Sequence, residues 1–328
     1  MNKYGLSRNI PIPIKRSIRQ DCGFGCVLCG NAIFQYEHID PEFADSKEHD
    51  PEKIALLCGS CHDKVTRGIW SKQMVKEART NPICKQEGFS IFSLDVSNAA
   101  FFIEIGQTKF KNLQTIIEID GQQILGIKFP EEPSAPPRIS AKFFDRDNVE
   151  IAAIEENEWK GSVDAFDIET VGKKITIRNA KKKVDLVIGL EPPNLLRIES
   201  LNLQYNNTKI IGSAIDGFEV NLPDTSVKIP SEPTIIQKAP FWLSIRDGKI
   251  NLGSDKVANF FGRRGEESEL PGHIQINGAR VETTTAEEAG ISPRPGAKPG
   301  TKIMKVKTTG AGKGITINIQ LPSDKNSK

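Results

Sequence analysis

The chain has 328 residues, of which 38% are hydrophobic and 26% are charged. This is enough apolar material for more than one core, so we expect a globular protein with two or more folded units. The formal net charge of +2 is too small to indicate a polyanionic partner by itself. The opening segment lacks the apolar region of a signal peptide, and no stretch reaches the roughly 18 apolar residues of a membrane span. We therefore expect a cytoplasmic protein with no membrane partner.

The helical signals lie in the first quarter of the chain. Residues 14–20 (IKRSIRQ) predict a short basic helix. Residues 60–80 are compatible with helix, with a break near Gly68 and a new start at Ser71. The side chain of Ser71 is a suitable N-cap for the segment KQMVKEAR that follows it. Beyond this segment the helical signal stops.

From about Phe89 onward the chain consists of short β-branched runs separated by Gly, Asn, Asp and Pro. Examples are AFFIEI, TIIEIDGQQILGIKF, PRISAKFF, NVEIAAI, KKITIRN and KVDLVIGL. Runs at roughly ten-residue intervals are typical of an antiparallel sandwich or barrel, although an irregular solenoid gives a similar pattern. The expected fold class is therefore α+β, with a small helical unit followed by a predominantly antiparallel β region.

Changes in composition suggest four parts. We expect a metal-binding domain at 1–88, a β-rich domain at 89–231, a β-rich extension at 232–288, and a basic linker with a C-terminal hairpin at 289–328. The proline-rich segments 129–137 and 229–233 indicate seams or long turns. The last part contains eight Lys and Arg residues against a single acidic residue, Asp324, a composition that is more often a solvated surface than a phosphate-binding tail.

All six cysteines fall between positions 22 and 84. Such local use differs from a disulfide framework spread over a secreted fold. Two C-x-x-C pairs, Cys26 with Cys29 and Cys58 with Cys61, are typical of a structural zinc ion held by four thiolates. A redox dithiol is the rival interpretation, but it needs only one pair. The remaining cysteines, Cys22 and Cys84, are interpreted as small buried side chains.

Four thiolates would saturate a tetrahedral zinc ion and leave no open position for water or substrate. A zinc ion at this site would therefore be structural, holding together a segment too small to bury a core of its own. Within the segment lie Glu37, His38 and His49, and His62 directly follows Cys61. Such groups are able to form a second, open metal site. For His49 the commoner interpretation is a solvated loop residue.

Residues 13–80 resemble the HNH, or ββα-metal, nuclease family. The resemblance is carried by YEHI, which contains Glu37 and His38, by CGSCH, which ends in His62, and by EKIALLC, where the family commonly has N-[IL]-x-x-L-C. HNH units attached to other domains are common in bacterial and phage proteins, which suggests a setting in phage or bacterial defence. No comparable resemblance was found for the β region.

The resemblance implies a metal-dependent endonuclease that hydrolyses phosphodiester bonds of DNA. His38 would be the general base that activates water, and Glu37 and His62 would hold Mg²⁺ or another divalent cation. Thr66 stands where some members have a further imidazole ligand, so two protein ligands plus waters are expected. The β region would serve targeting or regulation, or bind a protein partner or a second copy of the chain.

Lys53 occupies the position of the family's asparagine, which braces the loop of the base. A lysine cannot accept a hydrogen bond. The alternatives are that Asp50 or His49 braces the loop, that Lys53 contacts the scissile phosphate, or that the unit is a zinc-stabilised nucleic-acid- or protein-binding module without catalysis. Several basic side chains are candidates for contacts to the DNA backbone or are simply solvated: Lys15, Arg16, Arg19, Lys64 and Arg67.

Overall fold

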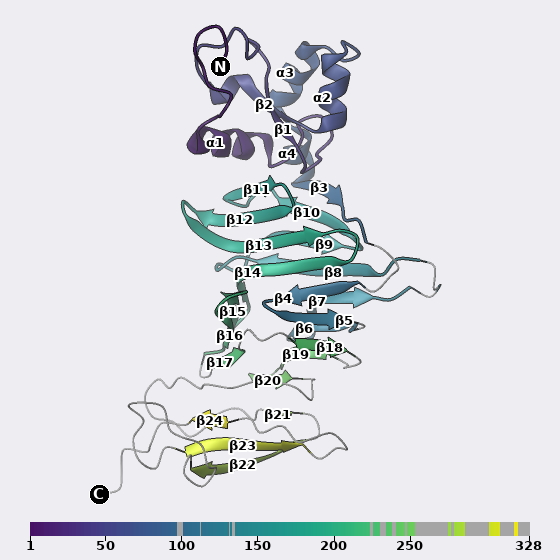
Figure 1. The fold of residues 1–328 in the computed structure, drawn as a ribbon, viewed down its shortest axis with the longest axis vertical. Coiled ribbons are helices and arrows are strands. Elements are labelled where there is room, and N and C mark those ends of the chain that lie inside the picture. Colours follow the sequence, from purple (N-terminus) through teal and green to yellow (C-terminus); the bar gives the residue numbers. More distant parts are fainter. Residues whose placement is uncertain are drawn as a thin grey trace, which may run out of the picture.

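The computed structural model describes the greater part of the chain and places the helical unit at one end of a long β region (Figure 1). The described residues are 1–96, 101–111, 113–130, 132, 135–223, 226–229, 234–237, 241–246, 248–252, 275–276, 279–285, 302–308 and 318–320. No helix among them is long and apolar enough to cross a membrane.

The helical unit, here called the N-terminal module, comprises all the helices found among the described residues and one small sheet. Its elements are α1 (Ile12–Cys22), β1 (Gln35–His38), the 3-10 helix η1 (Pro51–Lys53), β2 (Ile54–Leu57), α2 (Gly59–Thr66), α3 (Lys72–Thr80) and α4 (Ile83–Glu87). Helix α3 begins as predicted, because the Ser71 hydroxyl accepts a hydrogen bond from the backbone N–H of Met74 at 3.1 Å. Helix α4 has no counterpart in the sequence prediction.

Strands β1 and β2 form an antiparallel hairpin in which Glu37 is paired with Ala55 and His38 with Ile54. Strand β2 is buried along its whole length, whereas β1 is exposed at its start and buried only at His38. The hairpin leads directly into α2. This arrangement places the end of β1 and the start of α2, the two segments that carry the candidate site, next to one another.

The first large sheet of the β region is an open meander with β3 at one edge. Its spatial order is β21-β20-β19-β6-β7-β8-β9-β10-β3. The bounds are β3 (Phe89–Ser93), β6 (Thr115–Ile119), β7 (Gln122–Lys128), β8 (Arg138–Phe144), β9 (Glu150–Glu155), β10 (Glu158–Ser162), β19 (Phe241–Arg246), β20 (Lys249–Leu252) and β21 (Gln275–Ile276).

The second large sheet follows the order β11-β12-β13-β14-β15-β16-β17, with β4, β5 and β18 joined to it through β14. The bounds are β4 (Phe102–Ile105), β5 (Thr108–Lys111), β11 (Asp167–Val171), β12 (Lys174–Ala180), β13 (Lys183–Glu191), β14 (Leu195–Tyr205), β15 (Thr208–Ser213), β16 (Gly217–Asn221), β17 (Ser226–Ile229) and β18 (Thr234–Gln237).

One continuous apolar core joins the two large sheets, with Ile139 and Phe143 of β8 and Ile188 of β13 among its members. Figure 1 shows the strands β12–β14 in front of β8–β10. The α+β class and the mainly antiparallel pairing are as predicted. The barrel alternative is wrong, because each large sheet runs in an open order in the described part of the chain and buries its face against the other sheet.

A three-stranded sheet lies nearest the C-terminus. It consists of β22 (Ala279–Thr285), β23 (Lys302–Thr308) and β24 (Asn318–Gln320), with β23 antiparallel to both neighbours. The basic linker and hairpin were predicted at 289–328. Of this range the structure describes only β23 and β24, and residues 289–301, on which the linker falls, lie outside the described residues.

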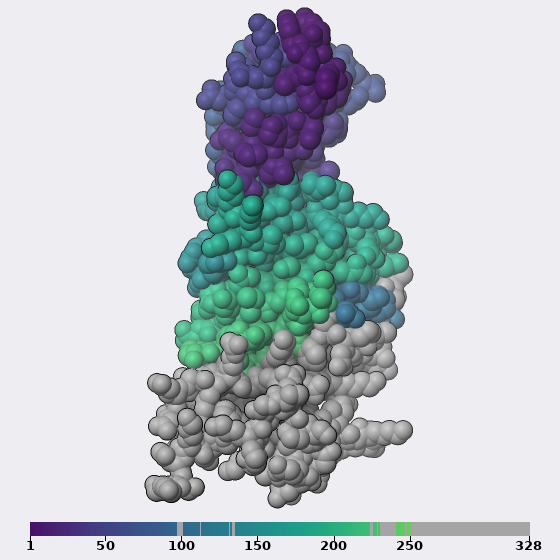
Figure 2. Space-filling model, turned by 60° about the vertical axis from the view of Figure 1, so that its left-hand side comes forward, coloured from purple at the N-terminus to yellow at the C-terminus, as the bar shows by residue number. Residues whose placement is uncertain are grey.

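The N-terminal module is attached to the β region by packing, backbone pairing and charge. Phe24 and Ala32 of the module belong to the core of the β region. The backbone N–H of Ala32 donates to the carbonyl of Ile91 in β3 at 2.8 Å. On the other side, Arg19 of α1 meets Asp167 of β11. Figure 2 shows the resulting continuous surface between the module and the sheets.

Candidate metal and nuclease site

Four cysteines meet in the N-terminal module as the sequence predicts. The sulfurs of Cys26, Cys29, Cys58 and Cys61 all lie within 4.8 Å of one another. Gly30 follows the first pair with φ +76°, a backbone conformation that favours glycine. The second pair spans the start of α2, where the Cys58 sulfur accepts a hydrogen bond from the backbone N–H of Cys61.

The spacing of the sulfurs fits a tetrahedral ion. The Cys29 sulfur lies 3.6 Å from that of Cys58 and 3.7 Å from that of Cys61. Zinc–sulfur bonds of about 2.3 Å in a tetrahedron require sulfurs about 3.8 Å apart. A hydrogen bond from the Cys29 thiol lowers the pKa of Cys26 to about 5, while burial raises the pKa of Cys61 to about 12. The cluster therefore fits a zinc site, since a thiolate-binding cation stabilises the deprotonated form of such groups.

Glu37 and His62 come together across the hairpin and the helix. Oε2 of Glu37 lies 3.1 Å from Nε2 of His62, and both side chains are partly exposed. A carboxylate oxygen and an imidazole nitrogen are both ligands for divalent cations. Thr66, one helical turn further along, donates its hydroxyl to the backbone carbonyl of His62 at 2.9 Å. The exposure of the pair leaves access for water and substrate.

His38 faces different neighbours from Glu37, since adjacent strand residues point to opposite sides. Its Nε2 lies 3.2 Å from Nδ1 of His49, and the Phe43 ring contacts both imidazoles. Both histidines are only 8% exposed. Burial, and next the charge of His49, lower the pKa of His38 below its ordinary value. His38 is therefore neutral at neutral pH, the state that a general base requires.

The prediction that His49 is a solvated loop residue is wrong. The loop between β1 and η1 folds back so that the His49 ring stacks on Phe43 at an interplanar angle of 14°. Its Nε2 is buried and has no hydrogen-bond partner among the described residues. A polar loop composition suggests solvent exposure, and only the contact with His38 and Phe43 reverses that expectation.

Lys53 does not reach into this cluster. Its side chain is 52% exposed and forms an ion pair with Asp50 at 3.0 Å. This pairing lowers the pKa of Asp50 and raises that of Lys53. The backbone at this position does brace the hairpin, because the Lys53 carbonyl accepts a hydrogen bond from the N–H of Ile39 at 2.9 Å. Asp50 itself caps η1 by accepting from the backbone N–H of Glu52.

Two of the basic residues considered for DNA contacts, Arg16 and Arg19, instead contact a carboxylate of the β region. Nε of Arg19 donates to Asp167 at 2.8 Å, and Nε of Arg16 approaches the same carboxylate at 3.1 Å. Their assignment to the DNA backbone is wrong, because both guanidinium groups serve the junction with the β region. Arg67 pairs with Asp63 on the surface, and the ammonium of Lys64 lies 4.2 Å from the centre of the Trp70 ring.

Lys72 is a residue of the candidate site that the sequence did not predict. Its Nζ lies 4.0 Å from Glu37 and 2.7 Å from Glu42. The residue opens α3, and no local pattern in the sequence relates it to β1. For His49 the only signal in the sequence was the clustering of histidines, since three of the four in the chain fall between the two cysteine pairs or next to them.

Residues 20–68 match the model of the family described as HNH endonuclease, which confirms the resemblance inferred from the sequence. The match spans β1, β2 and α2, and therefore includes the four cysteines, Glu37, His38 and His62. No curated protein and no solved structure matches the chain. The family match suggests a nuclease or nucleic-acid-binding function for the module.

Proposed function

We propose that the protein is an HNH-type, metal-dependent endonuclease that hydrolyses phosphodiester bonds of DNA. The proposal rests on two contacts: the 3.1 Å approach of Glu37 to His62, and the 3.2 Å approach of His38 to His49. These groups come from the end of β1, the following loop and the start of α2. They supply a candidate cation site and a neutral base within one small module.

The cation-binding residues in this proposal are Glu37 and His62. When bound, Mg²⁺ or another divalent cation would neutralise charge on the scissile phosphate and on the leaving oxygen. Lys72, 4.0 Å from Glu37, adds positive charge beside the same carboxylate. The four cysteines would hold zinc in a purely structural role, because all four tetrahedral positions are taken by sulfur.

His38 acts as the general base that takes a proton from the attacking water. If Nε2 of His38 donates to Nδ1 of His49, the lone pair on Nδ1 of His38 is available for that proton. His49 thus fixes the orientation of the base, a task that the family assigns to asparagine at position 53. The ion pair of Lys53 with Asp50 leaves the Lys53 side chain outside this arrangement.

The test is a plasmid-nicking assay on the full-length protein with Mg²⁺ and with Mn²⁺. His38→Ala is expected to lower the nicking rate by about 10²–10⁴-fold, the usual contribution of a general base. Gln73→Ala, at an exposed position of α3, is the matched control and should nick like the natural protein. Equal nicking by His38→Ala and the natural protein would remove His38 from the proposed role.

The second candidate is a zinc-stabilised nucleic-acid-binding module without catalysis. The exposed Lys53, in place of an amide that could brace the base, favours it. This function predicts binding to DNA that weakens steeply with salt and is accompanied by no cleavage in any divalent metal. The same protein preparations distinguish the two candidates, because binding and nicking are measured side by side.

The β region is proposed to target or regulate the module. Its support is the close attachment of α1 to β11, where Arg19 makes two hydrogen bonds to Asp167 at 2.8 and 2.9 Å. The hydroxyl of Tyr36, next to Glu37 on β1, accepts a hydrogen bond from the same guanidinium at 2.8 Å. A module released from the β region that retained the same activity and DNA preference would contradict this assignment.

A further inference from the structure

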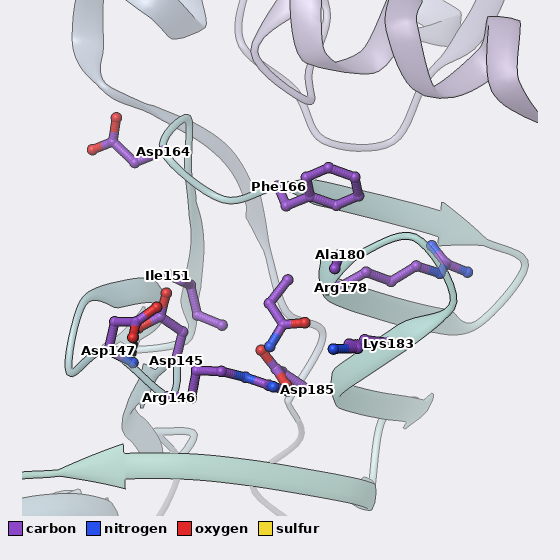
Figure 3. Close-up of a pocket in the computed structure, with 11 residues that line it drawn as sticks. Asp145, Arg146, Asp147, Ile151, Asp164, Phe166, Arg178, Ala180, Lys183 and Asp185 are labelled. Atoms are coloured by element: carbon purple, nitrogen blue, oxygen red, sulfur yellow. Dashed lines mark hydrogen bonds and ion pairs between the residues drawn. The ribbon is translucent and has the colours of Figure 1, made fainter.

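A polar cavity of about 450 Å³ lies in the β region, away from the candidate nuclease site. It is formed by the turn between β8 and β9, the turn between β10 and β11, and the facing ends of β12 and β13. Figure 3 shows Asp185, Arg146 and Lys183 directed toward the same space. A space of this size suits a small organic molecule rather than a single ion.

The cavity contains buried polar atoms that lack partners. Asp185 is 1% exposed, and its Oδ1 accepts hydrogen bonds from Arg146 at 3.2 Å and from Asn202 at 3.0 Å. Within the part of the chain that the structure describes, its Oδ2 has no hydrogen-bond partner, nor have the amide oxygen and nitrogen of Asn179. Leaving such atoms unsatisfied costs about 1–3 kcal/mol each. Two of these three atoms are acceptors, so the lining favours a molecule that mainly donates hydrogen bonds.

The charge around the cavity is negative once its existing ion pairs are considered. Arg146 is paired with Asp185, and Arg178 is paired with Asp167 and Glu169. Lys183 forms no ion pair among the described residues. The lining contains three further carboxylates, which outnumber the Lys183 ammonium: Asp145, Asp147 and Asp164. Burial also raises the pKa of Asp185, although the hydrogen bond and the charge of Arg146 act in the opposite direction.

We propose that this cavity binds a small organic cation that carries a guanidinium or primary ammonium group, with Asp185 and Asn179 as the receptor groups. Such a group presents several N–H donors to the free carboxylate oxygen and the amide oxygen at once. The surrounding carboxylates favour positive charge and oppose a phosphate or carboxylate ligand. The Phe166 ring at the edge of the cavity offers an apolar surface for the ligand's carbon chain.

The site adjoins the junction with the N-terminal module. Arg178 lines the cavity and also holds Asp167 and Glu169, the two carboxylates that Arg19 contacts. The Arg16 guanidinium lies 5.5 Å from the centre of the Phe166 ring. Ligand binding is therefore measured on the full-length protein, in which the walls formed by the junction residues are intact. The proposal concerns the β region and does not depend on the nuclease assignment.

Isothermal titration calorimetry with L-arginine, agmatine and Nα-acetyl-arginine amide provides the test. Saturable binding of at least one of the three is expected, with no binding of citrulline, which replaces the guanidinium by a neutral urea of the same shape. Binding of free arginine or agmatine alone would identify a free metabolite as the source. Binding of the doubly blocked arginine alone would identify an arginine side chain of a polypeptide.

Variants connect the binding to this cavity. Asp185→Asn is expected to weaken affinity about tenfold or more, since it removes the charge that faces the ligand. Because Asp185 is buried, the double change Asp147→Asn with Asp164→Asn serves as a variant at exposed positions, with an expected loss of about two- to fivefold. Asp216→Asn, in the turn between β15 and β16, is the matched control and should bind like the natural protein.

Three results would overturn the proposal. They are the absence of binding for all three cations, equal binding of citrulline, and unchanged affinity in both the Asp185→Asn and the double variant. Each of these results would show that this cavity does not recognise an organic cation through Asp185.

Discussion

The N-terminal module and the β region differ in what stabilises them. The β region shares one large apolar core between two sheets. The core of the module is small, and three of its buried members, Cys26, Cys58 and Cys61, belong to the cysteine cluster that fits zinc. A small unit buries too little apolar surface to be stable on that account alone. We therefore expect the stability of the module to depend on a metal bound by this cluster, whereas that of the β region depends on packing.

The same difference explains where the candidate sites lie. In the module the sulfurs fix β2 and α2, so that polar side chains at the end of β1 and the start of α2 are held without being part of a core. In the β region the polar cavity lies at turns and strand ends, where the apolar core stops. The junction between them is a third environment, a buried group of charges around Asp167.

The largest expected effect comes from removing a cysteine of the cluster. Cys58→Ser should reduce bound zinc well below one ion per chain and unfold the module, because structural zinc contributes about 10–16 kcal/mol to folding in small zinc domains. Metal analysis and segment-resolved hydrogen exchange measure this, with protection expected to persist in the β region. Cys84→Ala is the matched control, a buried cysteine outside the cluster that should retain zinc. Full zinc content in Cys58→Ser would contradict the comparison.

The next largest effect is expected in the core of the β region. Trp159 is completely buried and packs between Phe92 and Phe143. Trp159→Ala should destabilise the β region by about 3–5 kcal/mol through the cavity it creates, with zinc content unchanged. Denaturant unfolding of the variant measures the loss.

Trp159→Phe sharpens this prediction. The indole N–H of Trp159 has no hydrogen-bond partner among the described residues, so phenylalanine removes a buried polar atom together with part of the ring. The loss of stability should therefore be clearly smaller than for alanine. A variant as unstable as Trp159→Ala would indicate that the indole nitrogen is bonded after all, for example to a buried water.

The junction should respond to both mutation and acid. Asp167→Ala leaves Arg19 buried without its main partner, which is expected to cost about 3–5 kcal/mol. Although burial raises the pKa of Asp167, hydrogen bonds from Arg19 and Arg16 hold it below its ordinary value of 3.8. The stabilisation is therefore complete above that value and is lost as the pH falls below it.

Hydrogen exchange in α1 and β11, followed from pH 7 to pH 3, measures the acid response of the junction. Exchange should rise at the acid end in the natural protein. It should already be high at pH 7 in Asp167→Ala, with the zinc-binding segment still protected. Asp216→Asn is the control. Unchanged protection of α1 in Asp167→Ala would show that the apolar contacts of Phe24 and Ala32 hold the junction without the charges.

Local signals in the sequence were sufficient for much of the fold. The Ser71 cap, the two C-x-x-C pairs and the β-branched runs each specify their structure within a few residues. The partners of Arg19 could not be predicted in this way, because Asp167 lies 148 positions further along the chain. Short α4, between Pro82 and Gly88, lacks the length over which a helical period becomes visible.

The residues of the candidate site also fall into those that the sequence predicts and those that only tertiary contacts bring to the site. Glu37, His38 and His62 were predicted from their position around the cysteine pairs together with the resemblance to the HNH family, and the structure brings Glu37 and His62 to 3.1 Å. His49 and Lys72 approach the site only through tertiary contacts. His49 belongs to a loop whose composition predicts solvent exposure, and its burial follows from the stacking on Phe43.

Substitution of Lys53 is expected to change the structure least. Its effect on nicking distinguishes the two candidate functions. The side chain is exposed and pairs only with Asp50, so Lys53→Asn should leave the melting temperature of the module unchanged. If the module is an impaired nuclease, the new amide restores a brace for the loop and the nicking rate rises. Lys53→Gln, with the amide one methylene further out, is the matched control. If His49 already orients His38, nicking is present in the natural protein and neither change raises it, which assigns the asparagine's task to His49.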